Sequence, residues 1–287
     1  MINKIAVIGV GLIGGSIVRD CKKKWPKLEC TGIDINPKNI SKAVELGWVD
    51  KQGSINDLQN MDVVIISIPV NAIENELKDI LDRISPNTLV MDTGSTKNAI
   101  CKSVENHKNR HQFLAAHPIA GTEYSGPDAA LEGLFIDKTM IVCEIEKTQF
   151  KLQNRAKEIF ETLKCNVRYM TPLAHDKHIA YVSHLSHISS FMLGKTVMQE
   201  EESERDIFDL AGSGFESTVR LAKSSPAMWT AIFSQNKEHV IASLDRYVEN
   251  LSRFRESIMN NDTTTMYKEL ESTNRIKNIL EGIKNGE

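Results

Sequence analysis

The first 170 residues alternate between short apolar runs and longer amphipathic segments. The runs that we expect to form strands lie at 4–10, 30–33, 62–68, 88–91, 113–116, 139–144 and 166–170, and the first of them is rich in β-branched side chains. Uninterrupted apolar runs of this length are typical of strands that are buried on both faces of a parallel sheet. Segments 12–24, 38–46 and 71–84 fit helices between these strands. The alternation predicts an α/β fold of the Rossmann type, doubly wound around a mostly parallel sheet.

From about position 171 the pattern is helical to the end, apart from a Gly-Ser-Gly turn at 212–214. Pro172 suits the first turn of a helix, which we expect to run to about Glu200. Pro226 begins a second helix, and a last helix is expected at 264–283. In the segment after Pro226, apolar side chains recur with heptad spacing at Val240, Leu244, Tyr247, Leu251, Phe254 and Ile258. Such a heptad seam requires burial by another helix of this chain or of a second copy.

Residues 9–16 read GVGLIGGS, a G-x-G-x-x-G sequence directly after the first predicted strand. In such turns Gly9 permits the tight bend, Gly11 lets the backbone approach a pyrophosphate, and Gly14 lets helix and strand pack closely. The free amides of the following helix, from Leu12 and Ile13 onward, can then bind phosphate. The pattern predicts a dinucleotide site; the alternative is a glycine turn in an α/β domain that binds no nucleotide.

A second predicted strand ends in Asp34, 20 positions after Gly14. A carboxylate at this place accepts a hydrogen bond from the ribose 2′-OH and repels a 2′-phosphate, so NAD is favoured over NADP. Without a nucleotide, Asp34 would act only as a helix cap. Ser67, Pro69 and Val70 lie at the end of the strand at 62–68 and just after it, and we expect them to line the dinucleotide.

Two polar turns follow the predicted strands at 88–91 and 113–116, and they bring Ser95 and His117 to the carboxyl ends of those strands. Ligands bind at that edge of an open α/β sheet. Imidazole titrates near neutrality, so His117 is the candidate general acid or base. Ser95 is expected to orient His117 or to bond a substrate hydroxyl; alternatively it caps a helix at 96–104.

Four of the eight histidines lie close together, at His175, His178, His184 and His187. On a regular helix the first two face one side and the last two face another, so four metal ligands do not converge. We therefore expect no metal site, and one or two of these histidines should face an anionic substrate. Arg220 follows the Gly-Ser-Gly turn and can clamp a carboxylate, unless it only pairs with Glu216 on the surface.

Composition narrows the class of protein. The chain has 287 residues, of which 41% are hydrophobic and 25% charged, as in globular proteins. A net charge of −3 argues against a general nucleic-acid binder, which would need a basic face. The five cysteines are odd in number and include no C-x-x-C, which favours a reducing cytoplasm. The N-terminus resembles neither a signal peptide nor a membrane span.

In combination, these stretches resemble the prephenate dehydrogenase family, which includes arogenate and cyclohexadienyl dehydrogenases. The matching stretches follow the family's order over nearly the whole chain: GVGLIGGS at 9–16, DTGSTK at 92–97, HPIAGTE at 117–123, SHLSH at 183–187, and Gly214-Phe215 through Arg220 to Trp229. The resemblance implies two domains, an NAD-binding domain at 1–170 and a helical domain for substrate binding and dimerisation at 171–287. It also implies a homodimer, which would give the heptad seam its partner.

The activity that the resemblance implies is NAD-dependent oxidative decarboxylation of prephenate to 4-hydroxyphenylpyruvate and CO₂, in tyrosine biosynthesis. In this comparison His117 is the catalytic histidine that acts on the ring C4 hydroxyl, and Ser95 bonds both that histidine and the hydroxyl. His187 and Arg220 match the family's substrate-binding residues. Further positions that match the substrate cleft are Thr122, Glu123 and His175, with Glu123 expected to gate the cleft or to pair with the arginine.

The chain departs from some relatives in two respects. Ser217 and Thr218 stand where these relatives carry an acid that pairs with the arginine. The length leaves no room for a regulatory ACT domain or a fused mutase domain, so tyrosine inhibition would have to act at the active site.

Three alternatives stay open. Arogenate dehydrogenase would use the same mechanism on an amino rather than a keto side chain. A β-hydroxyacid dehydrogenase would need a catalytic lysine in the helical part, where Lys177 and Lys195 lack that family's glycine-rich setting. An NAD-sensing dimer without catalysis would have no need of a base beside the nicotinamide.

Overall fold

The computed structural model of this chain describes residues 2–202 and 206–285. It contains two compact units, Met1–Lys237 and Glu238–Glu287. The first unit holds the sheet and the helices that surround the candidate site, and the second holds the helical residues from Glu238 onward.

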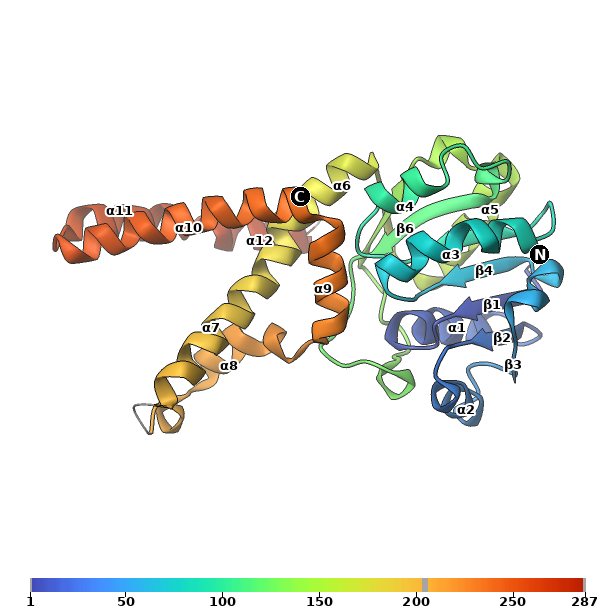
Figure 1. Cartoon of the computed structure of the whole chain (residues 1–287), viewed down its shortest axis with the longest axis horizontal. Helices are drawn as coiled ribbons and strands as arrows, with labels where there is room; N and C mark the ends of the chain where they lie inside the picture. The colour runs from blue at the N-terminus through green and yellow to red at the C-terminus, as the bar shows by residue number, and fades with distance from the viewer. Residues whose placement is uncertain (1, 203–205, 286–287) are drawn as a thin grey trace. The chain divides into compact units, whose positions relative to one another are not determined.

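An eight-stranded sheet forms the centre of the first unit, in the order β3-β2-β1-β4-β5-β6-β7-β8 (Figure 1). Its strands are β1 Lys4–Ile8, β2 Glu29–Ile33, β3 Lys51–Gln52, β4 Val63–Ile66, β5 Leu89–Asp92, β6 Phe113–Pro118, β7 Thr139–Cys143 and β8 Asn166–Met170. The strands from β3 to β6 are parallel, β7 is antiparallel to β6, and β8 is parallel to β7. The predicted doubly wound, mostly parallel sheet is confirmed.

Both faces of the sheet are covered by helices, as its uninterrupted apolar strands require. One face packs against α1 (Leu12–Lys24), α2 (Pro37–Glu45) and α5 (Phe150–Leu163). The opposite face packs against α3 (Val70–Arg83) and α4 (Asn98–Ser103). Alternate residues of each strand therefore enter different hydrophobic clusters: Ile5 and Val7 lie on the α1 side, and Ala6 lies on the α3 side.

Helices follow β8, as predicted, but with different boundaries. They are α6 Pro172–Ile179, a π-helical turn at Ala180–His184, α7 Leu185–Glu201, α8 Ser213–Val219, α9 Pro226–Gln235, α10 Lys237–Met259, α11 Thr263–Thr273 and α12 Ile276–Asn285. Short 3-10 turns occur at Ile55–Asn60, Arg110–Gln112, Pro127–Ala129, Ile145–Lys147, Phe208–Leu210 and Arg220–Lys223.

Three predicted long helices are each interrupted. The helix expected from Pro172 to Glu200 contains the π-helical turn, the helix expected from Pro226 ends at Asn236, and the last one divides between α11 and α12. A π turn adds one residue to a helical turn and is frequent at functional sites. Apolar spacing along the chain does not reveal such breaks, because the periodicity continues on both sides of them.

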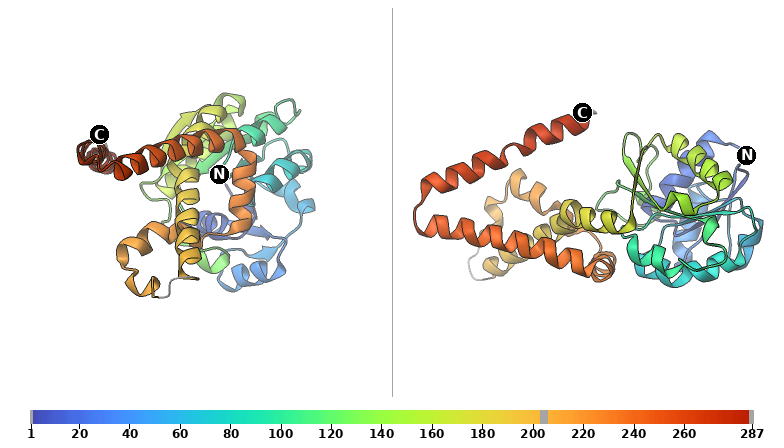
Figure 2. Two further views of the ribbon diagram at one scale, coloured as in Figure 1. Left: turned by 60° about the vertical axis from the view of Figure 1, so that its left-hand side comes forward. Right: turned by 90° about the horizontal axis from the view of Figure 1, so that it is seen from above.

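The heptad seam lies on α10, and much of it is open to solvent in the single chain. Leu251 is 51% exposed and Ile258 is 54% exposed. Within the second unit, α11 and α12 turn back from the end of α10 (Figure 2). Among the described residues, no helix is long and apolar enough to cross a membrane.

Candidate active site

The glycine turn lies between β1 and α1, and its glycines have different tasks. Gly9 has φ +91°, and a Cβ there would lie 2.3 Å from the Ser67 carbonyl oxygen. A Cβ at Gly14 would lie 2.2 Å from the Gly9 carbonyl oxygen. At Gly11, the nearest atom would be 3.9 Å away, on Gly126. Gly9 and Gly14 therefore permit close packing, whereas Gly11 leaves room for a ligand.

Helix α1 begins at Leu12, directly after this turn. Gly11 is its N-cap and has no side chain to bond the first amides, so the N–H groups of Leu12, Ile13 and Gly14 are available to an anion. This open, positively polarised cradle is what the pyrophosphate of a dinucleotide requires, and the residues present therefore fit NAD.

Asp34 follows β2 and is held in place by three donors. Its Oδ2 accepts from the Val10 amide at 3.2 Å, and its Oδ1 accepts from the Asn36 amide at 2.9 Å and from Asn39 Nδ2 at 3.2 Å. The carboxylate therefore has a fixed position beside the glycine turn, where a ribose would lie.

The turn after β4 runs alongside the same glycines. The Ser67 amide donates to the Ile8 carbonyl at 2.7 Å, and Ser67 Oγ accepts from Thr93 Oγ1 at 3.0 Å. Pro69 is the N-cap of α3 and Val70 is its first residue. This arrangement agrees with the predicted position of Ser67, Pro69 and Val70 beside the dinucleotide, and their contact with it stays a prediction.

His117 lies near the end of β6 and is almost completely buried. Its Nδ1 is 2.8 Å from His175 Nε2, and His175 Nδ1 is 2.7 Å from Asp176 Oδ1. An ionised carboxylate only accepts, so His175 donates from Nδ1 and accepts at Nε2. His117 must then donate from Nδ1, which leaves its Nε2 unprotonated. The chain of bonds therefore fixes His117 as a proton acceptor at Nε2.

Burial lowers the pKa of His117 well below its usual value, and the neighbouring His175 and Lys97 lower it further. The pKa of His175 is also lowered by burial, although its bond to Asp176 opposes this. For Asp176, burial alone would raise the pKa, but donors from His175, Asn98 and Lys97 keep it below the usual value. Both histidines are therefore neutral, and the acid is ionised, at neutral pH.

The backbone amides of Lys97 and Asn98 fix the carboxylate of Asp176. They donate to its Oδ1 at 2.7 Å and to its Oδ2 at 2.9 Å. The Lys97 side chain forms a fully buried ion pair with Asp92, and its Nζ donates to the Ala116 carbonyl at 2.8 Å. The turn after β5 thus holds both the strand that carries His117 and the acid that orients His175.

Ser95 lies in this same turn, partly buried, but not where the cap hypothesis puts it. Helix α4 begins at Asn98 with Lys97 as its N-cap, so the alternative that Ser95 caps a helix at 96–104 is wrong. Within the described residues, Ser95 makes no hydrogen bond to His117, whose Nδ1 is occupied by His175. A bond from Ser95 to a substrate hydroxyl stays a prediction.

His175 also differs from the expectation that it faces the substrate cleft. It is fully buried, and both of its ring nitrogens are engaged, one by His117 and one by Asp176. Its neighbour Asp176 carried no signal in the sequence, because one acid beside one histidine is common. His178, one turn further along α6, is exposed. Among the described residues, no group of three or more histidines, cysteines or acids could hold a metal ion.

His187 stacks on Trp229, with ring centroids 3.5 Å apart and an interplanar angle of 26°. Its Nδ1 donates to the Ser183 carbonyl at 2.9 Å, so its Nε2 is the atom left for a ligand. Burial lowers the pKa of His187, whereas the bond to the Ser183 carbonyl raises it. The nearby positive charge of Arg220 lowers it further.

Arg220 follows α8 and pairs with Glu123, not with Glu216. Its Nη1 is 2.9 Å from Glu123 Oε2, whereas Glu216 lies 3.7 Å from Lys223 Nζ. The predicted pairing of Glu123 with the arginine is therefore confirmed, and the surface alternative is wrong. Thr122, on the exposed loop beside Glu123, accepts from the Tyr124 amide at 3.3 Å.

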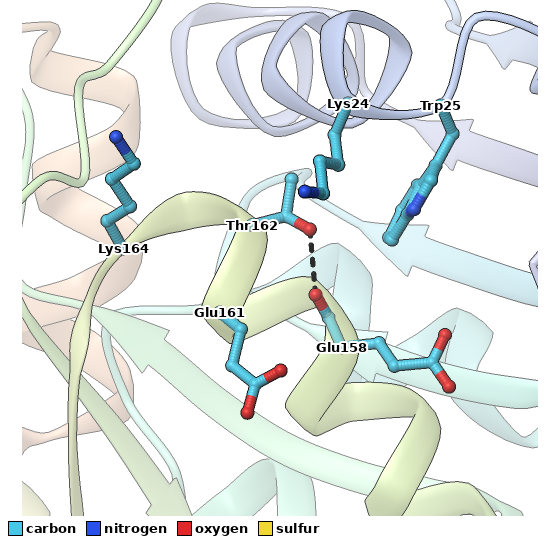
Figure 3. A pocket seen from close by; sticks show the side chains of 6 residues that line it. All are labelled: Lys24, Trp25, Glu158, Glu161, Thr162 and Lys164. Carbon is cyan, nitrogen blue, oxygen red and sulfur yellow. Dashed lines mark hydrogen bonds between the residues drawn. The ribbon is translucent and has the colours of Figure 1, made fainter.

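A separate hollow of about 270 Å³ lies on the surface, between the end of α1 and the C-terminal half of α5 (Figure 3). It is lined by Lys24, Trp25, Glu158, Glu161, Thr162 and Lys164. None of the candidate site residues lines this hollow, so it is not part of the candidate active site.

A glycine turn that fits a dinucleotide and a buried histidine poised to accept a proton lie at the same edge of the sheet. This combination is typical of an NAD-dependent oxidoreductase. Comparison with known proteins identifies the family. Residues 17–169 match the family described as prephenate dehydrogenase, nucleotide-binding domain, and residues 171–272 match prephenate dehydrogenase, dimerization domain. The chain belongs to the prephenate dehydrogenase family.

Individual relatives agree. A prephenate dehydrogenase of Bacillus subtilis is 29% identical over 93% of this chain and 73% of its own length. A cyclohexadienyl dehydrogenase of Zymomonas mobilis is 26% identical over 96% of this chain and 95% of its own length. The crystal structure of prephenate dehydrogenase from A. aeolicus, in complex with hydroxyphenyl propionate and NAD⁺, is similar with a TM-score of 0.88. That chain is 33% identical, and the similarity covers 97% of this chain and 98% of that one.

Proposed function

We propose that this protein catalyses the NAD-dependent oxidative decarboxylation of prephenate to 4-hydroxyphenylpyruvate and CO₂, a step of tyrosine biosynthesis. The observation that carries the proposal is the bond sequence Asp176–His175–His117, which leaves His117 Nε2 as a proton acceptor. His117 lies at the same edge of the sheet as the turn fitted for a dinucleotide. The relative from A. aeolicus, crystallised with NAD⁺ and a hydroxyphenyl ligand, supports both the cofactor and the ring of the substrate.

The bound cofactor supplies a nicotinamide ring that accepts hydride from the substrate's C4. His117 Nε2 accepts the proton of the C4 hydroxyl as the carbonyl forms there. Positive charge then develops on the His117–His175 pair, and the ionised Asp176 stabilises that charge through His175. Loss of the ring carboxylate as CO₂ leaves its bonding electrons in the ring, which becomes aromatic, and the C4 oxygen takes the proton back from His117. Aromatisation of the ring drives the reaction. The protein therefore has to position the substrate against the cofactor and to supply one base. A strong electrophile is less important for this reaction.

We assign substrate binding to residues around this base. Ser95 bonds the C4 hydroxyl from the turn after β5. His187 and Arg220 bind carboxylates, and Thr122 and Glu123 border the same region, with Glu123 holding Arg220 until substrate competes for it. His187 has only Nε2 free, so it must take up a proton to donate to an anion. His175 is assigned as a positioning residue in place of the substrate contact that we had expected.

We place NAD binding in residues 1–170 and substrate binding and dimerisation in residues 171–287. The open apolar seam on α10 and the match of 171–272 to a dimerization domain support a homodimer. A reducing cytoplasm is our proposal for the compartment, supported by five cysteines that are all free thiols.

The direct test is an assay of the purified protein with NAD and prephenate, followed by NADH absorbance, and repeated with arogenate and with NADP. We expect the highest turnover with prephenate and NAD. Turnover with arogenate alone would keep the mechanism and change the substrate. No turnover in any mixture, from protein shown to bind NAD, would contradict the proposal and favour a sensor or an unrelated hydroxyacid substrate.

A further inference from the structure

Asn236 is a buried amide next to the candidate active site, and no pattern in the sequence pointed to it. It is the C-cap of α9, its backbone amide bonds the Ile232 carbonyl at 3.0 Å, and its side chain is 4% exposed. A buried amide must have its donors bonded, or it destabilises the fold. The question is therefore what these donors hold.

Both N–H groups of the Asn236 amide are directed at the segment that orients His117. Asn236 Nδ2 donates to the Asp176 carbonyl at 2.7 Å and lies 3.3 Å from His184 Nδ1. The Asp176 carboxylate, by contrast, is held by the amides of Lys97 and Asn98. Asp176 is thus fixed at its side chain by the turn after β5 and at its main chain by the end of α9.

The second bond sets the tautomer of His184. An amide nitrogen only donates, so His184 accepts at Nδ1 and, when neutral, carries its proton on Nε2. Burial lowers the pKa of His184 to about 4, so the ring is neutral near pH 7. The titratable groups that act on it are Asp176, His175 and His187, and its other neighbours include the rings of Trp229 and Phe233.

We propose that Asn236 is a positioning residue for the reaction, which holds α6 through the Asp176 carbonyl and orients His184, a neighbour of the His117–His175 pair, through its Nδ1. The inference rests on the proposed function. It assigns to Asn236 no contact with substrate or cofactor. The helix itself does not depend on Asn236, because the Asp176 carbonyl also accepts from the Ala180 amide. Replacement should therefore change the catalytic step more than the fold.

The test compares Asn236→Asp and Asn236→Ala with the wild-type chain. Aspartate removes both donors, places an acceptor against the Asp176 carbonyl, and favours a protonated His184. Alanine removes the donors and adds no charge. We expect kcat to fall about 30-fold in N236D and about 5-fold in N236A, with KM for NAD within about twofold of wild type. The matched control is N274D, which makes the same change at the exposed C-cap of α11 and should leave kcat unchanged.

The pH profile separates positioning from a merely structural role. In N236D the acid limb of kcat should move to higher pH. A carboxylate beside His184 raises the pKa of that ring, so His184 becomes protonated at a higher pH than in the wild-type chain. The positive charge of the protonated His184 then opposes proton uptake by His117 and lowers kcat. The double variant N236D/H184Q should return the acid limb to its wild-type position. N236A should keep the wild-type limb and lose only rate.

Melting curves and NAD binding show which variants are folded. If N236D is not folded, N236A decides the question, because a positioning role predicts a lower kcat at an unchanged melting temperature and an unchanged KM for NAD. The inference is overturned if the folded variants keep kcat within about twofold of wild type, or if N236D loses rate without any shift of the acid limb. A wild-type chain that binds NAD without turnover would instead overturn the proposed function, and the inference with it.

Discussion

His117 and His175 are joined edge to face, with Nδ1 of the first 2.8 Å from Nε2 of the second and an interplanar angle of 70°. The two residues are 58 positions apart and belong to β6 and α6. Because His175 is itself oriented by Asp176, the direction of every proton in the pair is determined. The protonation of His117, the base that we propose, is therefore set by α6 and not by the strand that carries it.

Removing the charge of Asp176 should slow the reaction without preventing cofactor binding. In D176N, the positive charge that develops on His117 and His175 loses its buried counter-charge, so kcat should fall about 100- to 10,000-fold. NAD affinity, measured by calorimetry, should stay within about threefold of wild type, because Asp176 does not border the glycine turn. The control is D209N, an exposed aspartate of the turn at Phe208–Leu210. A D176N enzyme with wild-type kcat would remove the histidine pair from the mechanism.

Arg220 should act on substrate affinity more than on rate. Replacement by glutamine removes a cation that can bind a carboxylate, and KM for prephenate should rise about 10- to 100-fold while kcat changes little. The neighbouring K223Q variant is the control, because Lys223 pairs only loosely with the exposed Glu216. Equal effects of R220Q and K223Q on KM would show that general charge, and not the Arg220 position, attracts the substrate.

The buried histidines should make the protein sensitive to acid. The pKa of His184 is lowered from 6.5 to about 4, so between these values the unfolded chain binds a proton that the folded chain does not. Stability from this group is fully present above pH 6.5 and is lost as pH falls toward 4. The loss from His184 alone is on the order of 3 kcal/mol. Urea unfolding across this range should show the decline, and H184Q should show a shallower one; identical slopes would contradict the assignment.

Asp34 should control the choice between NAD and NADP. Its carboxylate is held by the Val10 and Asn36 amides and by Asn39, and it repels a 2′-phosphate from a fixed position. In D34S, kcat/KM with NAD should fall about 10-fold and the preference for NAD over NADP should fall by more than that. D245S, at an exposed acid of α10, is the control. An unchanged ratio of the two cofactors would place the discrimination elsewhere.

The sequence predicted the parts of the site that depend on local order along the chain. Strands buried on both faces, the glycine turn and the polar turns after β5 and β6 are local features, and they placed Gly9, Asp34, Ser95 and His117 at the correct edge of the sheet. The pairing of Glu123 with Arg220 was expected only because the family resemblance suggested it.

What the sequence did not predict depends on packing between distant segments. Nothing in the order of residues shows that α6 turns Asp176 toward the amides of Lys97 and Asn98, or that Asn236 reaches the same helix. The π turn at Ala180–His184 also changes which histidines share a side, so a rule based on a regular helix could not place His184.

In the reaction that we propose, His117 accepts the hydroxyl proton during NAD-dependent oxidation of prephenate. This role is tested by comparing the wild-type chain with H117N, following NADH and 4-hydroxyphenylpyruvate from prephenate and NAD, with NAD binding measured in parallel. We expect equal amounts of the two products from wild type, and an H117N protein that binds NAD normally but turns over at least about 1,000-fold more slowly. An H117N protein with turnover close to wild type would contradict it.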